Sequence, residues 1–169
     1  AGLNGWTPGP GSGTQSTKPF EGSTYYFAGS TSVNGVEQTV NLLAAGSSAS
    51  AVDSQDLVAV FGGRIRSASE SPTDRGSLTL TFLDASGGEI SHATVNAQNT
   101  TDRWELAGDR VGIPSGTRSI RYRFEATPSA GQSNDSTLDA SFLYVLPETA
   151  APDLGAFGNT PAEAAQNPA

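Results

Sequence analysis

Short segments in which apolar and polar side chains alternate recur along the chain, and turns rich in glycine and serine separate them. In residues 118–126 the apolar Ile120, Tyr122 and Phe124 alternate with charged side chains. Residues 76–84 show the same period of two. This period is typical of a β-strand with one buried face and one face in water, so both segments predict strands.

Other segments of similar length complete the pattern. They are aromatic-rich, alternating or continuously apolar, and turn residues bound them: 23–29, 35–44, 56–63, 89–97 and 137–146. Residues 102–108 and 110–117 lead into the segment 118–126. The turn at residues 85–88 predicts a hairpin. About eight strands in this arrangement predict an all-β fold, an antiparallel β-sandwich of the jelly-roll type. We expect its inner surfaces to bury side chains such as Leu80, Tyr122, Phe124 and Phe142.

Both ends of the chain have the composition of loops. Residues 1–20 are rich in glycine, proline, serine and threonine, and the C-terminal segment combines proline with small residues. We therefore expect one sandwich domain at residues 1–146 and an irregular Pro/Ala-rich tail or linker at residues 147–169. In that tail, Leu154 and Phe157 are isolated apolar side chains that can dock on this domain or on a partner.

Composition narrows the classes of function. The 20 glycines and 10 prolines argue against a helical bundle, and the absence of cysteine excludes disulfides and thiolate metal sites. A formal net charge of -8 repels a phosphate backbone, which disfavours nucleic-acid binding. No apolar run approaches the roughly 20 residues that span a bilayer, so we expect no membrane insertion.

Catalytic chemistry has little support. The single histidine, His92, lies in an alternating segment, and the sequence places no nucleophile beside it. Glu70, Asp74, Glu89 and Glu105 are acidic candidates for a glycosidase pair, but no spacing singles out two of them. We predict that the chain is not an enzyme.

Sugar recognition requires a flat aromatic ring for the apolar face of a pyranose and planar polar groups for its hydroxyls. The aromatic candidates are Trp6, Tyr25, Tyr26, Trp104, Tyr122 and Tyr144. Trp104 also has the charged neighbour Arg103. Each tryptophan has a second interpretation as a packing residue, which for Trp104 means a place between the sheets.

Several motifs occur in a familiar order: "LNGWT", "FEGSTYYFAG", "VEQTVNL", "LTLTFLDASGGEI", "VGIPSGTRSIRYRFEA" and "SNDSTLDASFLYV". Through them, residues 3–146 resemble the galactose-binding-like β-sandwich superfamily, particularly the carbohydrate-binding-module-type domains of bacterial exported and phage structural proteins. The chain is also similar, more distantly, to the F-box-associated sugar-recognition domain. The resemblance implies a jelly roll without catalytic machinery that binds glycans through loops at one end. In the matching loop this chain has Gln132, Asn134 and Asp135.

The resemblance also implies a structural Ca²⁺ where the first and last strands meet. Asp139 matches a frequent calcium ligand in the last strand, and Glu21 and Gly22 lie in the matching turn. Calcium takes six to eight oxygen ligands, so Asp139 alone is not a site. The alternative is that its carboxylate accepts hydrogen bonds from backbone N–H groups near Asn134 and Ser136. In either case we expect Asp139 to tie the last strand to the turn near Gly22.

The chain departs from its relatives before "GW", where they usually carry a further strand with a calcium-binding glutamate. An unfilled sheet edge would invite strand addition from a partner. Two functions follow as expectations. One is a carbohydrate-binding or adhesion module displayed on an extracellular surface or particle. The other is a decoration or fibre-base subunit of a virion or other extracellular assembly, held by the tail and the open sheet edge.

Overall fold

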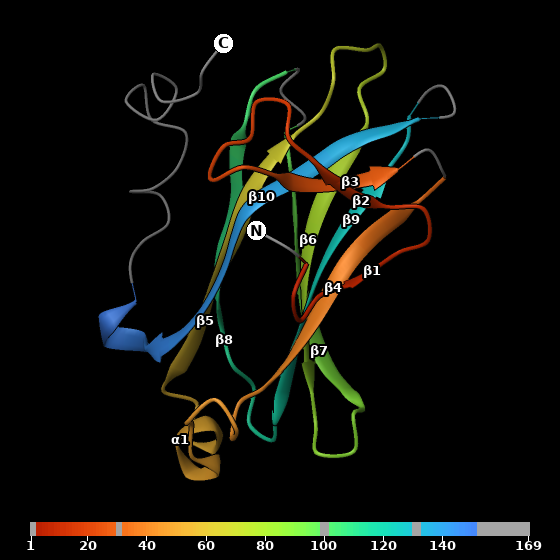
Figure 1. Ribbon diagram of the computed structural model, residues 1–169. Coiled ribbons are helices and arrows are strands. Elements are labelled where there is room, and N and C mark those ends of the chain that lie inside the picture. The colour runs from red at the N-terminus through yellow and green to blue at the C-terminus, as the bar shows by residue number, and fades with distance from the viewer. Residues whose placement is uncertain (1–2, 30–31, 99–101, 130–132, 152–169) are drawn as a thin grey trace.

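The computed structural model describes residues 3–29, 32–98, 102–129 and 133–151, which form two facing antiparallel sheets of five strands each (Figure 1). Sheet A has the order β1-β4-β9-β6-β7: Thr7–Pro8, Asn34–Asn41, Ser119–Thr127, Arg75–Leu83 and Glu89–Asn96. Sheet B has the order β2-β3-β10-β5-β8: Gly13–Gln15, Tyr25–Gly29, Asn134–Pro147, Leu57–Arg66 and Glu105–Gly112. The predicted antiparallel β-sandwich is confirmed, with ten strands in place of about eight.

The two additional strands, β1 and β2, lie within the first 20 residues, which were expected to form a loop. β1 spans two residues and includes Pro8, and β2 spans three residues and includes Gly13, so their composition is that of a loop and does not predict strands. A short helix, α1 (Ala49–Asp53), follows β4, and the Ser48 hydroxyl accepts a hydrogen bond from the Ala51 N–H at its start. Neither this helix nor the 3₁₀ turn described below is long and apolar enough to cross a membrane.

The core between the sheets contains the alternating apolar side chains of the central strands. Leu80, Tyr122 and Phe124 are buried there, as expected. Tyr122 packs edge-on against Phe61 and donates a hydrogen bond from its hydroxyl to the Gly62 carbonyl, at 3.0 Å. Burial raises the pKa of Tyr122. The ring therefore stays neutral and joins the two sheets.

A β-bulge in β10 overturns the expected position of Phe142. Asp139 pairs with Arg64 and Phe142 pairs with Gly62, so two residues of β10 oppose one residue of β5. Ala140, within the bulge, has a positive φ of 45°. The extra residue reverses the alternation of side chains along the strand. Leu138 points inward before the bulge; after it Leu143 and Val145 pack on the core, and Phe142 lies on the outer face of sheet B.

The last described residues continue from β10. This strand runs to Pro147, and a 3₁₀ turn, η1 (Glu148–Ala150), follows it. The Glu148 N–H donates to the Asp56 carbonyl at 2.8 Å, and Arg110 donates to the Glu148 carbonyl at 2.9 Å. Residues 152–169, with Leu154 and Phe157, lie outside the described residues, so the proposed tail and its boundary stay predictions.

Candidate functional site

An exposed aromatic pair lies on the outer face of sheet B, after the bulge in β10. Phe142 and Tyr144 are two residues apart on this strand and stack with their ring centroids 5.8 Å apart and an interplanar angle of 29°. Tyr144 is 58% exposed, the largest exposed fraction among the large apolar side chains of the described residues. The pair therefore presents a ring face to solvent.

Glycine opens the sheet beside this pair. Phe142, Gly62 and Gly108 are register partners across β10, β5 and β8. A Cβ added at Gly62 would lie 2.7 Å from Cζ of Phe142, so only glycine lets the ring lie down on the sheet. We call the surface formed by Phe142, Tyr144, Gly62 and Gly108 the aromatic platform. Arg110 lies in the same row of the sheet as Tyr144, with Val60 between them.

The other half of this outer face is covered by the segment that precedes β3. The guanidinium of Arg66 lies over the rings of Trp104 and Tyr25, at 4.6 and 5.0 Å, and donates to the carbonyls of Thr17 and Lys18. The indole N–H of Trp104 donates to the same Lys18 carbonyl at 3.1 Å. Trp104 is thus a packing residue on the outer face, and not between the sheets. With 3% of its surface exposed, it offers no open ring face to a ligand.

The structure does not bring together the five predicted ligand-binding residues that it describes. Arg103 is exposed beside the buried Trp104, whereas Trp6 is half-buried and packs edge-on against Tyr122, 5.5 Å away. Asn134 is fully buried, and its amide donates to the carbonyls of Ala126 and Ser32.

The remaining two residues also lie apart from the tryptophans. Gln132 lies outside the described residues. Asp135 joins an acidic cluster at the start of β10. Its role in glycan binding stays a prediction, as does that of the other five.

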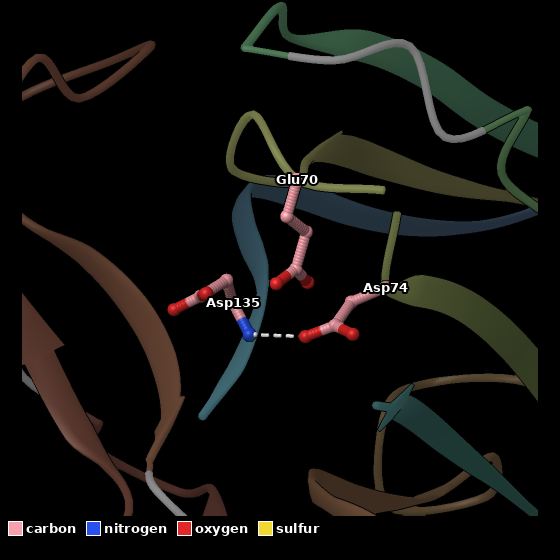
Figure 2. Close-up of side chains that lie close together, drawn as sticks. All are labelled: Glu70, Asp74 and Asp135. Atoms are coloured by element: carbon pink, nitrogen blue, oxygen red, sulfur yellow. Dashed lines mark hydrogen bonds between the residues drawn. The ribbon is translucent and has the colours of Figure 1, made fainter. Parts of the chain in front are cut away.

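That acidic cluster unites Glu70, Asp74 and Asp135, whose carboxylate oxygens lie within 4.8 Å of one another (Figure 2). Asp74 is fully buried and accepts hydrogen bonds from the N–H groups of Ser129 and Asp135, at 2.6 and 2.7 Å. A hydrogen bond to Asp74, together with burial, raises the pKa of Glu70. Three carboxylates in this geometry could hold a metal ion, although calcium would need further oxygen ligands from water.

Asp139 accepts backbone hydrogen bonds. One carboxylate oxygen accepts from the N–H groups of Phe20 and Glu21, at 2.8 and 3.0 Å, and the other accepts from the Ala140 N–H at 2.8 Å. The expected tie between the last strand and the turn near Gly22 is confirmed, with Phe20 and Glu21 as donors instead of groups near Asn134 and Ser136.

A cation fits poorly at Asp139. Three N–H dipoles already point their positive ends at this carboxylate. Glu21, its predicted co-ligand, is exposed, and the acidic cluster found in the described residues lies elsewhere. The ligand set of Glu21, Gly22 and Asp139 is therefore not assembled around an ion in this geometry.

The predicted catalytic candidates form no recognisable site in the described residues. His92 lies on the exposed surface of β7, with its Nδ1 2.7 Å from Glu89 Oε1. Glu70 and Asp74 do come together, but Asp74 is fully buried and its oxygens accept backbone hydrogen bonds. A substrate could not reach this pair as it could an open glycosidase pair.

Tyr144 was one of six aromatic candidates for sugar contact, but the sequence did not single it out. Period-two alternation from Leu138 would direct Phe142 inward and leave no reason to combine the two rings on an open face. The available signal was the pair of glycines at Gly62 and Gly63, since glycine inside a strand often accompanies a bulge or a close approach.

No protein-family model matches the chain, and no curated protein matches it in sequence. Solved structures do match in fold. A xylan-binding domain of Xyn10C from Paenibacillus barcinonensis superposes with a TM-score of 0.59 at 17% identity, covering 87% of this chain and 89% of that domain. The C-terminal family 22 carbohydrate-binding module of Clostridium thermocellum Xyn10B gives 0.61 at 11% identity, with 89% and 92% covered.

A third match is the enzymatically active domain of tailspike protein 4 of bacteriophage CBA120, with a TM-score of 0.62 and 14% identity. It covers 85% of this chain, but the chain spans only 20% of the length of that tailspike domain. At these identities the likeness concerns the fold. The described residues share the β-sandwich fold of these carbohydrate-binding modules.

Proposed function

We propose that the chain is a non-enzymatic carbohydrate-binding or adhesion module that acts outside the cell or on a particle surface. The observation that carries the proposal is the aromatic platform, because a stacked and solvent-exposed ring pair on a flat sheet suits the apolar face of a sugar ring. The fold of the two carbohydrate-binding modules described above supports it, as does the binding of xylan by one of them.

On this proposal Tyr144 stacks on a pyranose ring, and Phe142 holds the tyrosine ring in place from below. Arg110, two strands from Tyr144 in the same row, supplies N–H donors to sugar hydroxyls about 10 Å away across the sheet. Its hydrogen bond to the Glu148 carbonyl already orients this side chain. A linear glycan would lie across β10, β5 and β8, over the Phe142 ring that rests against Gly62.

Tyr144→Ala tests this proposal directly. Loss of the stacking ring should weaken binding to a responsive polysaccharide at least tenfold, measured by affinity electrophoresis after a glycan array has selected it. Val33→Ala, which removes a 51% exposed side chain from a different surface, is the matched control and should leave affinity unchanged. Equal binding by the wild type and Tyr144→Ala would exclude the platform. If no plant, bacterial or animal glycan on the array bound the chain, the result would count against a carbohydrate-binding function.

A second candidate function is a structural subunit, a decoration or fibre-base protein of a virion or extracellular assembly. The observation that favours it is the unpaired stretch of β10, which in the described residues has β5 on one side and no strand on the other from residue 142 onward. The fold of the phage tailspike domain is consistent with this candidate. Sedimentation of the full chain checks it: stable oligomers support an assembly role, and a monomer at all concentrations argues against self-assembly.

We also propose that Glu70, Asp74 and Asp135 bind a structural Ca²⁺ ion. With a dissociation constant of about 10⁻⁴ M, typical of extracellular modules, 1 mM Ca²⁺ would stabilise the fold by about 1.4 kcal/mol. The Tm should then rise by roughly 3–5 °C, and a chelator should reverse the rise. Glu70→Gln removes one carboxylate and should reduce this shift by more than half. If millimolar Ca²⁺ left the Tm unchanged, the proposed calcium site would be wrong.

A further inference from the structure

The sandwich is open along one side, where both sheets have an unpaired strand. In sheet B, β3 pairs with β10 only as far as Leu138. In sheet A, β1 pairs with β4 only at Val36 and Glu37. Beyond these points, β10 from residue 141 and β4 from residue 38 have no described neighbour on this side.

A cavity of about 380 Å³ lies between the two unpaired stretches. Its walls are mainly apolar, with Val40 and Leu42 from β4, Tyr122 from β9, and Leu143 and Val145 from β10. The remaining lining residues are Trp6, Gln38, Ala45, Ser47, Ser141, Phe142 and Tyr144, the last two of which also belong to the aromatic platform. We call this cavity, together with the free edge of β10 at residues 141–146, the edge slot.

The free edge of β10 lacks the protection that other strand edges carry. Residues 141–146 read "SFLYVL", with no charge and no proline, and their composition strongly favours β-structure. The outer strands of the two sheets differ: β7 carries Glu89 and His92, and β8 carries Asp109 and Arg110. Charges and prolines are the usual means of preventing an edge from pairing. Because residues 141–146 lack both, this edge is free to pair with a further strand.

Backbone geometry defines what would pair with it. Residues 142–147 bond to β5 on one side, so alternate residues direct their N–H and C=O groups into the slot. Within the described residues, no hydrogen bond joins these outward groups to another segment of the chain. An extended polypeptide satisfies such a row of alternating donors and acceptors, and its alternate side chains can enter the apolar cavity. A glycan supplies hydroxyls without this regular spacing, although Gln38, Ser47 and Ser141 do place polar side chains in the lining of the slot.

We infer that the edge slot binds a single extended polypeptide segment, about six residues long, which adds as a strand to the free edge of β10. Its apolar side chains at every second position fill the cavity between Val40 and Leu143. Trp6 and the residues after β4 line the slot beside β10, and we commit to a segment without a sheet of its own. This inference goes beyond the proposed glycan site, which lies on the outer face of sheet B.

The test uses the full chain and a probe peptide in which valine and threonine alternate between terminal lysines. We expect saturable binding, a change in Trp6 fluorescence, and slower hydrogen exchange at alternate amides of residues 141–146. Two control peptides carry methyl groups on the backbone nitrogens of either the valines or the threonines. Their side chains match the probe, but each lacks the N–H donors along one edge. At least one of them should bind ten or more times more weakly.

A pair of variants locates the binding in the cavity. Val40→Lys places a charge on the slot wall and should weaken peptide binding at least tenfold. Thr39→Lys places the same charge on the adjacent, exposed position of β4 and should have no effect. Equal binding of all three peptides would overturn the inference, and so would protection elsewhere than residues 141–146. Dimerisation of the free chain through β10 would also overturn it, since a second copy would then be the occupant.

The result is independent of the glycan proposal. Tyr144 also borders the cavity, but Tyr144→Ala should retain peptide binding, because the probe pairs with the backbone of β10, which remains in place. Loss of glycan binding with retained peptide binding separates the two sites. The reverse result, glycan binding without peptide binding, would overturn only the edge slot.

Discussion

Phe124→Ala is expected to lower the free energy of unfolding by about 4 kcal/mol, because it removes a large aromatic side chain from the centre of the core. Phe124 is fully buried on β9, the central strand of sheet A, and packs edge-on against Tyr26 with ring centroids 5.8 Å apart. The surrounding strands can close only a fraction of the cavity that alanine leaves, since both sheets are held by their ladders. Denaturant unfolding followed by far-UV circular dichroism measures the loss.

Phe124→Leu is the matched variant for this prediction. Leucine retains most of the buried volume, so we expect a loss of about 1–1.5 kcal/mol and an unchanged slope of unfolding against denaturant. Comparing the two variants separates the effect of the lost buried volume from the effect of replacing phenylalanine by any other residue. If alanine and leucine destabilised the chain equally, or if neither did, Phe124 would not occupy the packed interior described here.

Asp139→Ala is expected to lower the free energy of unfolding by about 3 kcal/mol, since it takes the acceptor from three backbone N–H groups. The bonds to Phe20 and Glu21 join β10 to a segment more than a hundred residues away in sequence. The third bond, from Ala140, holds the bulge. We therefore expect Asp139→Ala to loosen the segment before β3 and to raise hydrogen exchange there, as well as to lower the Tm.

Asp109→Ala controls for the charge. It also removes one carboxylate, but Asp109 is exposed and bonds only locally to the N–H of Arg110, so we expect less than about 0.5 kcal/mol. A chelator added to the wild type distinguishes the amide tie from an ion at Asp139. If the chelator reproduced the loss seen with Asp139→Ala, an ion would hold this strand and the amide interpretation would be wrong.

Most of the fold could be predicted from local sequence patterns, because apolar and polar residues alternate strictly in the core strands. Ile120, Tyr122 and Phe124 point inward at every second position, and one face of β9 is buried along its whole length. The strands β1 and β2 escaped detection because two or three residues cannot establish a period, and their pairing with β4 and β3 is set by distant residues. Long, half-buried strands can be read from sequence, while short edge strands depend on tertiary contacts.

The candidate site was less predictable, because it depends on one inserted residue. The bulge at Ala140 shifts the outward positions of β10 from odd to even numbers, and this shift alone carries Phe142 from the expected core to the outer face. Trp104 is a packing residue, which was one of its two interpretations, but it packs on the outer face of sheet B. Arg66 lies over its ring, and the Lys18 carbonyl accepts a hydrogen bond from its N–H. Neither arrangement follows from residues near in sequence.

The place of β10 in sheet B has a consequence for synthesis of the chain. It follows every other strand in sequence, yet it lies between β3 and β5 in the middle of its sheet (Figure 1). While the ribosome is still extending the polypeptide through residue 134, β3 and β5 have no common neighbour, and the apolar face of sheet A is incompletely covered. Closure of the domain must therefore wait until β10 has left the ribosome, and a nascent chain stalled before that point would be a client for chaperones.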